Sequence, residues 1–198
     1  MAGKIITISR QYGSGGREIG EKVAAALGYA YYDKELIRRV AQLGDIDVDF
    51  VTTSGEGVMG KLASLLARTG AGASRDEDSL PLSDRLFLVQ SRIIKEIAAE
   101  GPCVIVGHSA DYFLAECPDV LNVFIHANWE CRVARVMQRN DLDEATAIAR
   151  IKRIDRNRSS FYEQYTDRRW GQVENYHLTL SSSYFGTERA VAAITAVV

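Results

Sequence analysis

The sequence predicts an α/β fold in which a parallel sheet is covered by helices on both faces. Short apolar runs typical of buried strands alternate with amphipathic helical patterns along the chain. A glycine-rich turn joins the first strand to the first helix, and the 198 residues are enough to bury one full core. We therefore expect one domain over residues 1–198, without an internal repeat or a linker.

The first unit is a strand followed by a helix. Residues 5–8 form a short apolar run, which predicts a buried strand. Ile19, Val23 and Leu27 then recur at i, i+4 and i+8, the spacing of one helix face. Gly28 is a natural end for this helix, because glycine tolerates the left-handed backbone of a C-terminal cap.

A second strand and a second helix are expected next, and the amino-acid composition changes after them. The run "YAYY" at residues 29–32 predicts a strand, and Asp33 is a candidate N-cap for the helical pattern "KELIRRVAQL". Residues 44–83 are rich in glycine, serine and polar side chains around one short helical piece. We expect either a mobile surface excursion or a flap over a substrate, since long loops in compact domains are often lids.

The remaining segments repeat the alternation of helix and strand. Leu86, Val89, Ile93 and Ile97 mark a helix that begins near Ser83. The later strands are expected in "GPCVIVG", "LNVFIHA" and "YHLTLS", and the later helices in "NWECRVARVMQRN", "LDEATAIARIKRIDRNRSSFYEQY" and "TERAVAAITAVV".

Composition excludes several classes of protein. The formal net charge of −2 gives the whole molecule no attraction to nucleic acid or to an anionic membrane. The three cysteines form no C-x-x-C pair, so we expect neither a disulfide framework nor a zinc site. No apolar stretch approaches the length of a membrane span, and we expect a cytoplasmic protein.

The glycine-rich turn predicts an anion site. Gly13, Ser14, Gly15 and Gly16 lie between a strand and a helix. Glycines allow successive backbone N–H groups to point into one concavity, and the N-terminus of the next helix adds positive potential. A plain strand-to-helix turn is the alternative.

Two nucleotide-binding patterns match this turn imperfectly. The dinucleotide pattern G-x-G-x-x-G matches Gly13 and Gly15, but Glu18 stands where the third glycine belongs; Asp33 could serve as the ribose-binding acid. The P-loop pattern G-x-x-x-x-G-K-[ST] places Gly15 at its last glycine, Gly16 at the lysine and Arg17 at the hydroxyl residue. A shift by one residue puts Arg17 at the lysine and Glu18 at the hydroxyl. In both registers the usual Mg²⁺-ligating hydroxyl is absent.

Arginines in the second half of the chain favour phosphoryl transfer over hydride transfer. Arg132, Arg135 and Arg139 share one face of a predicted helix. Five further basic residues follow within residues 147–158: Arg150, Lys152, Arg153, Arg156 and Arg158. Guanidinium groups neutralise the charge that spreads over a moving phosphoryl group. A solvated helix face is the alternative, and the net charge argues against a nucleic-acid surface despite the aromatics in "SSFYEQYTDRRW".

Taken together, these stretches resemble the cytidylate kinase-like family of P-loop nucleoside monophosphate kinases. The resemblance rests on "ITISRQYGSGGREIGEKVAAALGYAYYDKELI", "CVIVGHSADYFL", "NVFIHA", "IKRIDRNRSSFYEQYT" and "WGQVENYHLTLSS", in that order over nearly the whole chain. It implies a three-layer P-loop NTPase fold with a five-stranded parallel sheet, an acceptor-binding insert at 44–83 and an arginine-rich lid at 139–169. It also implies transfer of the γ-phosphoryl group of ATP, brought with Mg²⁺, to a nucleoside monophosphate such as CMP or dCMP.

The resemblance also implies site residues. The donor phosphates would be bound by Gly13, Ser14, Gly15, Gly16, Arg17 and Glu18, with Arg132 and Arg135 nearby. "DRNR" at 155–158 matches the lid signature, which makes Arg156 and Arg158 the main catalytic candidates, with Arg153 and Arg17 beside them and Asp155 on the acceptor side. No metal site built from protein side chains is expected.

The acceptor side departs from the family pattern. Asp33 and Arg39 match the ends of the family's D-x-G-x-x-Y-R motif, but Glu35 replaces its glycine. At the end of the third strand, His108 stands where relatives carry arginine, which weakens an expected contact to the acceptor phosphate. Two alternatives therefore stay open: a nucleotide-binding regulatory module with weak or lost transfer, and a kinase for an acceptor that is not a nucleotide.

Overall fold

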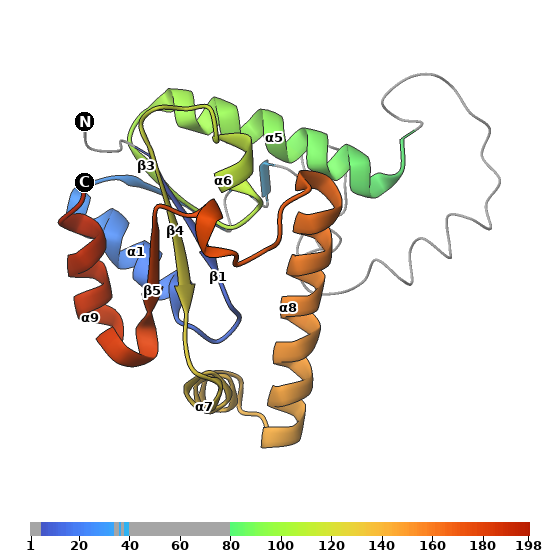
Figure 1. The fold of residues 1–198 in the computed structure, drawn as a ribbon, viewed down its shortest axis with the longest axis vertical. Coiled ribbons are helices and arrows are strands. Elements are labelled where there is room, and N and C mark those ends of the chain that lie inside the picture. The colour runs from blue at the N-terminus through green and yellow to red at the C-terminus, as the bar shows by residue number, and fades with distance from the viewer. Residues whose placement is uncertain (1–4, 34–35, 37, 40–79) are drawn as a thin grey trace.

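The computed structural model describes residues 5–33, 36, 38–39 and 80–198 (Figure 1). Its centre is a five-stranded parallel sheet with the strand order β2-β3-β1-β4-β5. The strands are β1 (Ile5–Arg10), β2 (Ala30–Tyr32), β3 (Cys103–Val106), β4 (Val120–His126) and β5 (Leu178–Ser181). The predicted three-layer α/β fold with five parallel strands is confirmed.

Helices cover both faces of the sheet (Figure 1). The helices are α1 (Gly16–Leu27), α5 (Leu82–Glu100), α6 (Ala110–Phe113), α7 (Trp129–Asn140), α8 (Glu144–Thr166) and α9 (Ser182–Thr195), and η2 (Val173–Asn175) is a 3-10 turn. α1 and α9 pack on one face and α5 with α6 on the other. α8 stands along the edge of this sandwich, and α7 crosses near the first turns of α8 (Figure 1).

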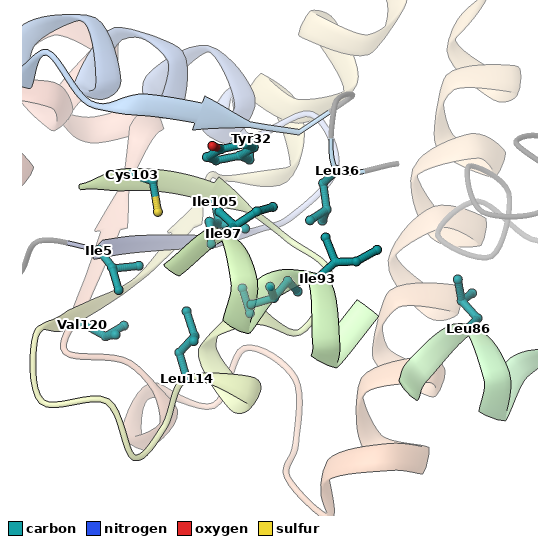
Figure 2. Close-up of a cluster of buried hydrophobic side chains, with 12 residues drawn as sticks. Ile5, Tyr32, Leu36, Leu86, Ile93, Ile97, Cys103, Ile105, Leu114 and Val120 are labelled. Carbon is teal, nitrogen blue, oxygen red and sulfur yellow. The ribbon is translucent and has the colours of Figure 1, made fainter. Parts of the chain in front are cut away.

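The alternation of side chains along the buried strands divides the core in two. Ile6 and Ile8 of β1 point toward α1 and α9, whereas Ile5 points toward α5. Figure 2 shows the second cluster, in which Ile93 and Ile97 of α5 lie against β1 and β3. Because both faces are covered, strands of this kind read as continuous apolar runs rather than as alternating ones.

The boundaries of the helices follow local chemistry. Gly28 caps α1 in the left-handed region, with φ of 68°, as the sequence predicts. The side chains of Asn128 and Asp143 accept hydrogen bonds from the first turns of α7 and α8. α9 begins at Ser182, five residues before the helical pattern predicted from Thr187, because a kink at Gly186 joins two helical pieces.

Most of the predicted helix after Asp33 and the predicted insert up to residue 79 lie outside the described residues. None of the helices in the described part of the chain is long and apolar enough to cross a membrane.

The C-terminal part of α8 is tied to the sheet by a buried hydrogen bond. The Tyr162 hydroxyl donates to Asp111 Oδ2 at 2.6 Å, and the Ser9 hydroxyl donates to Oδ1 at 3.3 Å. Burial raises the pKa of Asp111, whereas these two donors act in the opposite direction. The carboxyl group of Asp111 thus connects α8, α6 and β1.

Replacing Tyr162 by phenylalanine should lower the free energy of unfolding by about 1–3 kcal/mol, because the buried Asp111 carboxyl loses a donor. Urea unfolding of Tyr162→Phe beside Tyr184→Phe, whose ring is 75% exposed, measures this difference. Equal stability of the two variants would show that the hydrogen bond does not hold α8.

Candidate active site

The glycine-rich loop at residues 11–15 leaves the carboxyl end of β1 and enters α1. Gly13 and Gly15 have φ of 80° and 81°, a region that glycine reaches without strain. Gly15 is the N-cap of α1 and adds no side-chain cap, so the amides of the first turn face outward from the helix end. Loop and helix together present backbone N–H groups toward one hollow.

Hydrogen bonds fix the loop from behind. The fully buried Ser14 donates its hydroxyl to Gln11 O at 2.8 Å, and Ser182 donates to Ser14 O at 2.6 Å. Arg135 Nη1 of α7 donates to Gly13 O at 2.7 Å. These hydrogen bonds fix the carbonyl groups of Gln11, Gly13 and Ser14.

α7 packs so closely on the loop that Gly13 cannot be replaced without movement. A Cβ atom at residue 13 would lie 2.9 Å from Arg132 O and 3.0 Å from Val136 Cγ2. Glycine at this position is thus required by close approach as well as by its positive φ.

α8 is joined to the same loop through Asp155. Asp155 Oδ1 accepts a hydrogen bond from Tyr12 N at 2.8 Å, and its other oxygen forms an ion pair with Arg132. Arg132 Nε also donates to Tyr12 O at 2.8 Å. The side chains of Arg132 and Asp155 are largely buried. Burial strengthens the attraction between the two charges, and removing either partner would leave an unpaired buried charge at a large cost in stability.

Three residues later on α8, Arg158 reaches the end of β1. Its Nη1 donates to Arg10 O at 3.1 Å, and its guanidinium lies 5.7 Å from the centre of the Tyr12 ring. The two regions that the sequence identifies, the glycine loop and the arginine-rich segment, therefore lie side by side.

A cavity of about 210 Å³ lies between the loop, α7 and α8. Its lining holds no carboxylate among the described residues. The lining residues are Arg10, Gln11, Tyr12, Gly13, Gly15, Gly16, Arg17, Arg135, Val136, Arg139, Asn140, Arg150 and Arg158. Six of them are arginines, which gives the cavity a strongly positive potential.

Arg150 carries an unsatisfied donor in this lining. Its Nε is buried and has no hydrogen-bond partner. Buried donors are nearly always paired in folded proteins, and a water molecule or a ligand in the cavity would supply the acceptor for this one. A polyphosphate fits this cavity by charge, by donor type and by the outward-facing amides of the loop.

The structure brings together six of the sequence-predicted residues in this lining: Gly13, Gly15, Gly16, Arg17, Arg135 and Arg158. Ser14, Arg132 and Asp155 lie directly behind it and support the loop. Glu18 points into solvent and pairs with Lys22 at 3.6 Å. Arg153 and Arg156 are exposed on α8 and do not line the cavity.

The acceptor-side candidates lie at the ends of β2 and β3. Asp33 is 3% exposed and pairs with Arg17, at 2.6 Å between Nε and Oδ2, and with Arg10 at 3.9 Å. Arg39 instead pairs with Glu100 at 3.0 Å and lies over the Tyr32 ring. Arg39 therefore belongs to the outer edge of the sheet in this conformation and does not line the cavity.

His108 follows β3 in a left-handed conformation, with φ of 59°. Its Nδ1 is 3.2 Å from Gln90 Nε2 of α5, whose own Oε1 is buried without a partner. Burial, and then the positive charge of Arg10, lowers the pKa of His108 to about 4. The ring is thus uncharged at neutral pH.

Arg10, Arg139 and Arg150 were not among the site residues predicted from sequence. Arg10 is the last residue of β1 and directly precedes the loop, which is the signal that could have identified it. Arg150 lies eight residues, a little over two helical turns, before Arg158 on α8, and both line the cavity.

No cluster of three or more metal-binding side chains is found within residues 5–33, 36, 38–39 and 80–198. The cavity lining supplies neither a carboxylate nor the serine or threonine hydroxyl that a P-loop uses on Mg²⁺. Among the described residues, the cavity lining alone therefore supplies no protein ligand of the kind that Mg²⁺ usually takes.

Comparisons of the whole chain with solved structures identify the fold. A crystal structure of an uncharacterized protein from Eubacterium ventriosum aligns with a TM-score of 0.71 and 24% identity, covering 96% of this chain and 94% of that one. Shikimate kinase from Bacteroides thetaiotaomicron aligns with a TM-score of 0.54 and 12% identity, over 97% and 94% of the two chains. TT1252 from Thermus thermophilus aligns with a TM-score of 0.54 and 20% identity, over 99% and 98%.

The sequence itself is matched by a family model. No curated protein sequence is significantly similar to the chain. The model of the cytidylate kinase-like family, however, matches residues 5–184, which include the glycine loop, the ends of all five strands and all of α8. The chain belongs to the cytidylate kinase-like family.

Proposed function

We propose that the protein transfers the γ-phosphoryl group of ATP to a nucleoside monophosphate, with CMP and dCMP as the preferred acceptors. The observation that carries this proposal is the arginine-lined cavity above the glycine loop, to which α8 contributes Arg150 and Arg158. The family assignment supports a P-loop kinase. The unsatisfied Nε of Arg150 supports an anionic ligand.

On the donor side, the amides of Gly13 to Arg17 would bind the phosphates next to the transferred group. A helix N-terminus and a glycine loop stabilise such anions through aligned N–H dipoles. Arg135 of α7 would add positive charge beside these phosphates, next to the loop carbonyl Gly13 O to which it already donates a hydrogen bond. Arg132 would act indirectly, because its guanidinium is engaged by Asp155 and Tyr12.

The transfer itself needs no side-chain base, because an acceptor phosphate oxygen is already a nucleophile. The attacking oxygen forms a bond to the γ-phosphorus while the bond to the bridging oxygen of ADP breaks. Charge spreads over the phosphoryl oxygens in this step and is neutralised by surrounding cations. Arg158, Arg17 and Arg150 line the space where these charges would develop.

Mg²⁺ would enter with ATP and be held mainly by phosphate oxygens and water, in keeping with its preference for substrate phosphates. We assign no protein ligand to it. Segment 139–169 would serve as a lid that excludes water. Arg153 and Arg156 are exposed in this conformation, so a catalytic role for either requires a movement of α8.

Two observations favour a second candidate function, nucleotide binding with weak transfer or with a different acceptor. The P-loop lysine is replaced by Gly16 or, in the register shifted by one residue, by Arg17, and His108 is uncharged at neutral pH. An ADP-release assay with CMP, dCMP, UMP and AMP, beside calorimetry with ATP and Mg²⁺, separates the candidates. ADP release that requires CMP or dCMP supports the proposal. Tight ATP binding without acceptor-dependent ADP supports the second candidate, and absence of ATP binding contradicts both.

Arg158→Ala should lower kcat about 100- to 1,000-fold, because the variant removes a cation from the space around the moving phosphoryl group. Steady-state kinetics measures the effect, and Arg189→Ala, an exposed arginine on α9, is the matched control. Equal kcat values for Arg158→Ala and Arg189→Ala would remove Arg158 from the mechanism.

Arg156→Ala tests the proposed movement of the lid. If α8 moves during the reaction, this variant should lose kcat to an extent comparable with Arg158→Ala despite its exposed position. Unchanged kcat in Arg156→Ala would assign the role to the arginines that already line the cavity.

His108 should make the protein less stable as pH falls. The unfolded chain binds a proton at His108 near its ordinary pKa of 6.5, whereas the folded chain resists protonation until about pH 4. The stability contributed by the neutral ring is therefore complete above pH 6.5 and is lost progressively toward pH 4. Thermal unfolding of wild type and His108→Asn at several pH values measures this, and asparagine tolerates the left-handed backbone. Identical pH profiles would contradict the assignment.

A further inference from the structure

The position that holds the P-loop lysine has no room for a side chain in this protein. Gly16 is the first residue of α1, and in the register set by Gly15 it stands at the lysine position. A Cβ atom at residue 16 would lie 2.6 Å from Arg10 Cβ, 3.0 Å from Arg10 Cγ and 3.2 Å from Ile125 Cβ. Any side chain there would displace Arg10.

Arg10 stands at the other end of the same pattern. Counting back from Gly15, the first glycine of G-x-x-x-x-G falls on residue 10. The two altered positions are thus in direct contact: one has gained a long cationic side chain and the other has lost its side chain. In this register the lysine position carries no side chain, and a cationic side chain stands instead at the last residue of β1.

The path of the Arg10 side chain brings its charge to the end of β3. Beyond Gly16, its guanidinium lies against Gly107, where an added Cβ would overlap Nη1. It is 3.9 Å from Asp33 and only 14% exposed, and it lines the cavity above the loop. Glycines at residues 16 and 107 therefore both leave space for Arg10.

We propose that Arg10 replaces the P-loop lysine, so that its guanidinium binds the γ-phosphate of ATP from the side of β3. This inference rests on the proposed function and names a further binding and catalytic residue for it. Arginine suits the position because its planar fork can contact two phosphate oxygens at once. Located between the loop and Asp33, the guanidinium faces both the donor phosphate and the ends of β2 and β3.

A purely structural role for Arg10, as a partner of Asp33, makes different predictions. Asp33 already has a closer partner in Arg17, at 2.6 Å compared with 3.9 Å. If Arg10 only supported Asp33, its loss would change stability but leave the affinity for polyphosphate unchanged. Affinity and stability must therefore be measured on the same variants.

Calorimetry with inorganic triphosphate, and separately with ATP and Mg²⁺, tests the binding role. Arg10→Met keeps an apolar stem beside residue 16 and removes the charge. We expect its affinity for both ligands to fall at least about tenfold, whereas Arg92→Ala, an arginine on α5 that is 76% exposed, should bind as wild type does. Circular dichroism reports whether Arg10→Met is folded. Wild-type affinity in folded Arg10→Met would overturn the inference.

A double variant gives a second test, which measures both the melting temperature and the affinity for triphosphate. Gly16→Lys should lower the melting temperature, because its Cβ overlaps the Arg10 stem. Adding Arg10→Gly should restore both the melting temperature and triphosphate affinity, since the lysine then occupies the vacated space. The inference requires the double variant to exceed both single variants in affinity. A double variant that does not exceed both single variants in affinity would contradict it.

The two tests separate this inference from the proposed function. If wild type binds triphosphate through Arg10 but releases no ADP with any acceptor, the cation assignment stands and the kinase proposal fails. If wild type is an active kinase and Arg10→Met retains its ATP affinity and kcat, the kinase proposal stands and the cation assignment fails.

Discussion

The site depends on the carboxylate of Asp155, which joins α8 to the glycine loop. One oxygen accepts the Tyr12 amide, and the other pairs with Arg132 of α7, which in turn holds the Tyr12 carbonyl. In this arrangement the charge of Arg132 is paired with Asp155. Arg158, three residues after Asp155 on α8, donates a hydrogen bond to Arg10 O at the end of β1. The Asp155 carboxylate acts together with the hydrogen bonds from Arg135 to Gly13 O and from Arg158 to Arg10 O, which also join guanidinium groups to the loop. A buried ion pair of this kind contributes specificity of arrangement rather than much stability.

The charge balance of the cavity explains why an anion is expected there. Six arginines line it and no carboxylate does, so far as the described residues extend. Like charges gathered in a partly desolvated space repel one another, and the repulsion is relieved when a ligand supplies the opposite charge. The loop amides add positive dipoles on the same side. A triphosphate satisfies this arrangement better than a neutral or singly charged ligand.

Sequence patterns predicted the fold well because strands buried on both faces and helices with one apolar face leave clear periodicities. The strands and Gly28 as the end of α1 followed directly. The start of α9 was predicted too late, because the kink at Gly186 interrupts the helical pattern that precedes it.

Charge clusters predicted which segments would meet, but not which arginines would face the cavity. Arg132 and Arg135 lie on one helix face, yet only Arg135 lines the cavity, since Arg132 is turned toward Asp155. Arg10 was missed because a single residue at a strand end carries no periodic signal, and its role follows from the space left at two distant glycines.

A crystal structure with a non-hydrolysable ATP analogue tests the central claim most directly. The account predicts that the β- and γ-phosphates contact the amides of residues 13–17 and, within hydrogen-bond distance, the guanidinium groups of Arg158 and at least one other arginine of the cavity. Phosphates bound to the loop while α8 points its arginines into solvent, or a nucleotide bound elsewhere on the protein, would contradict it.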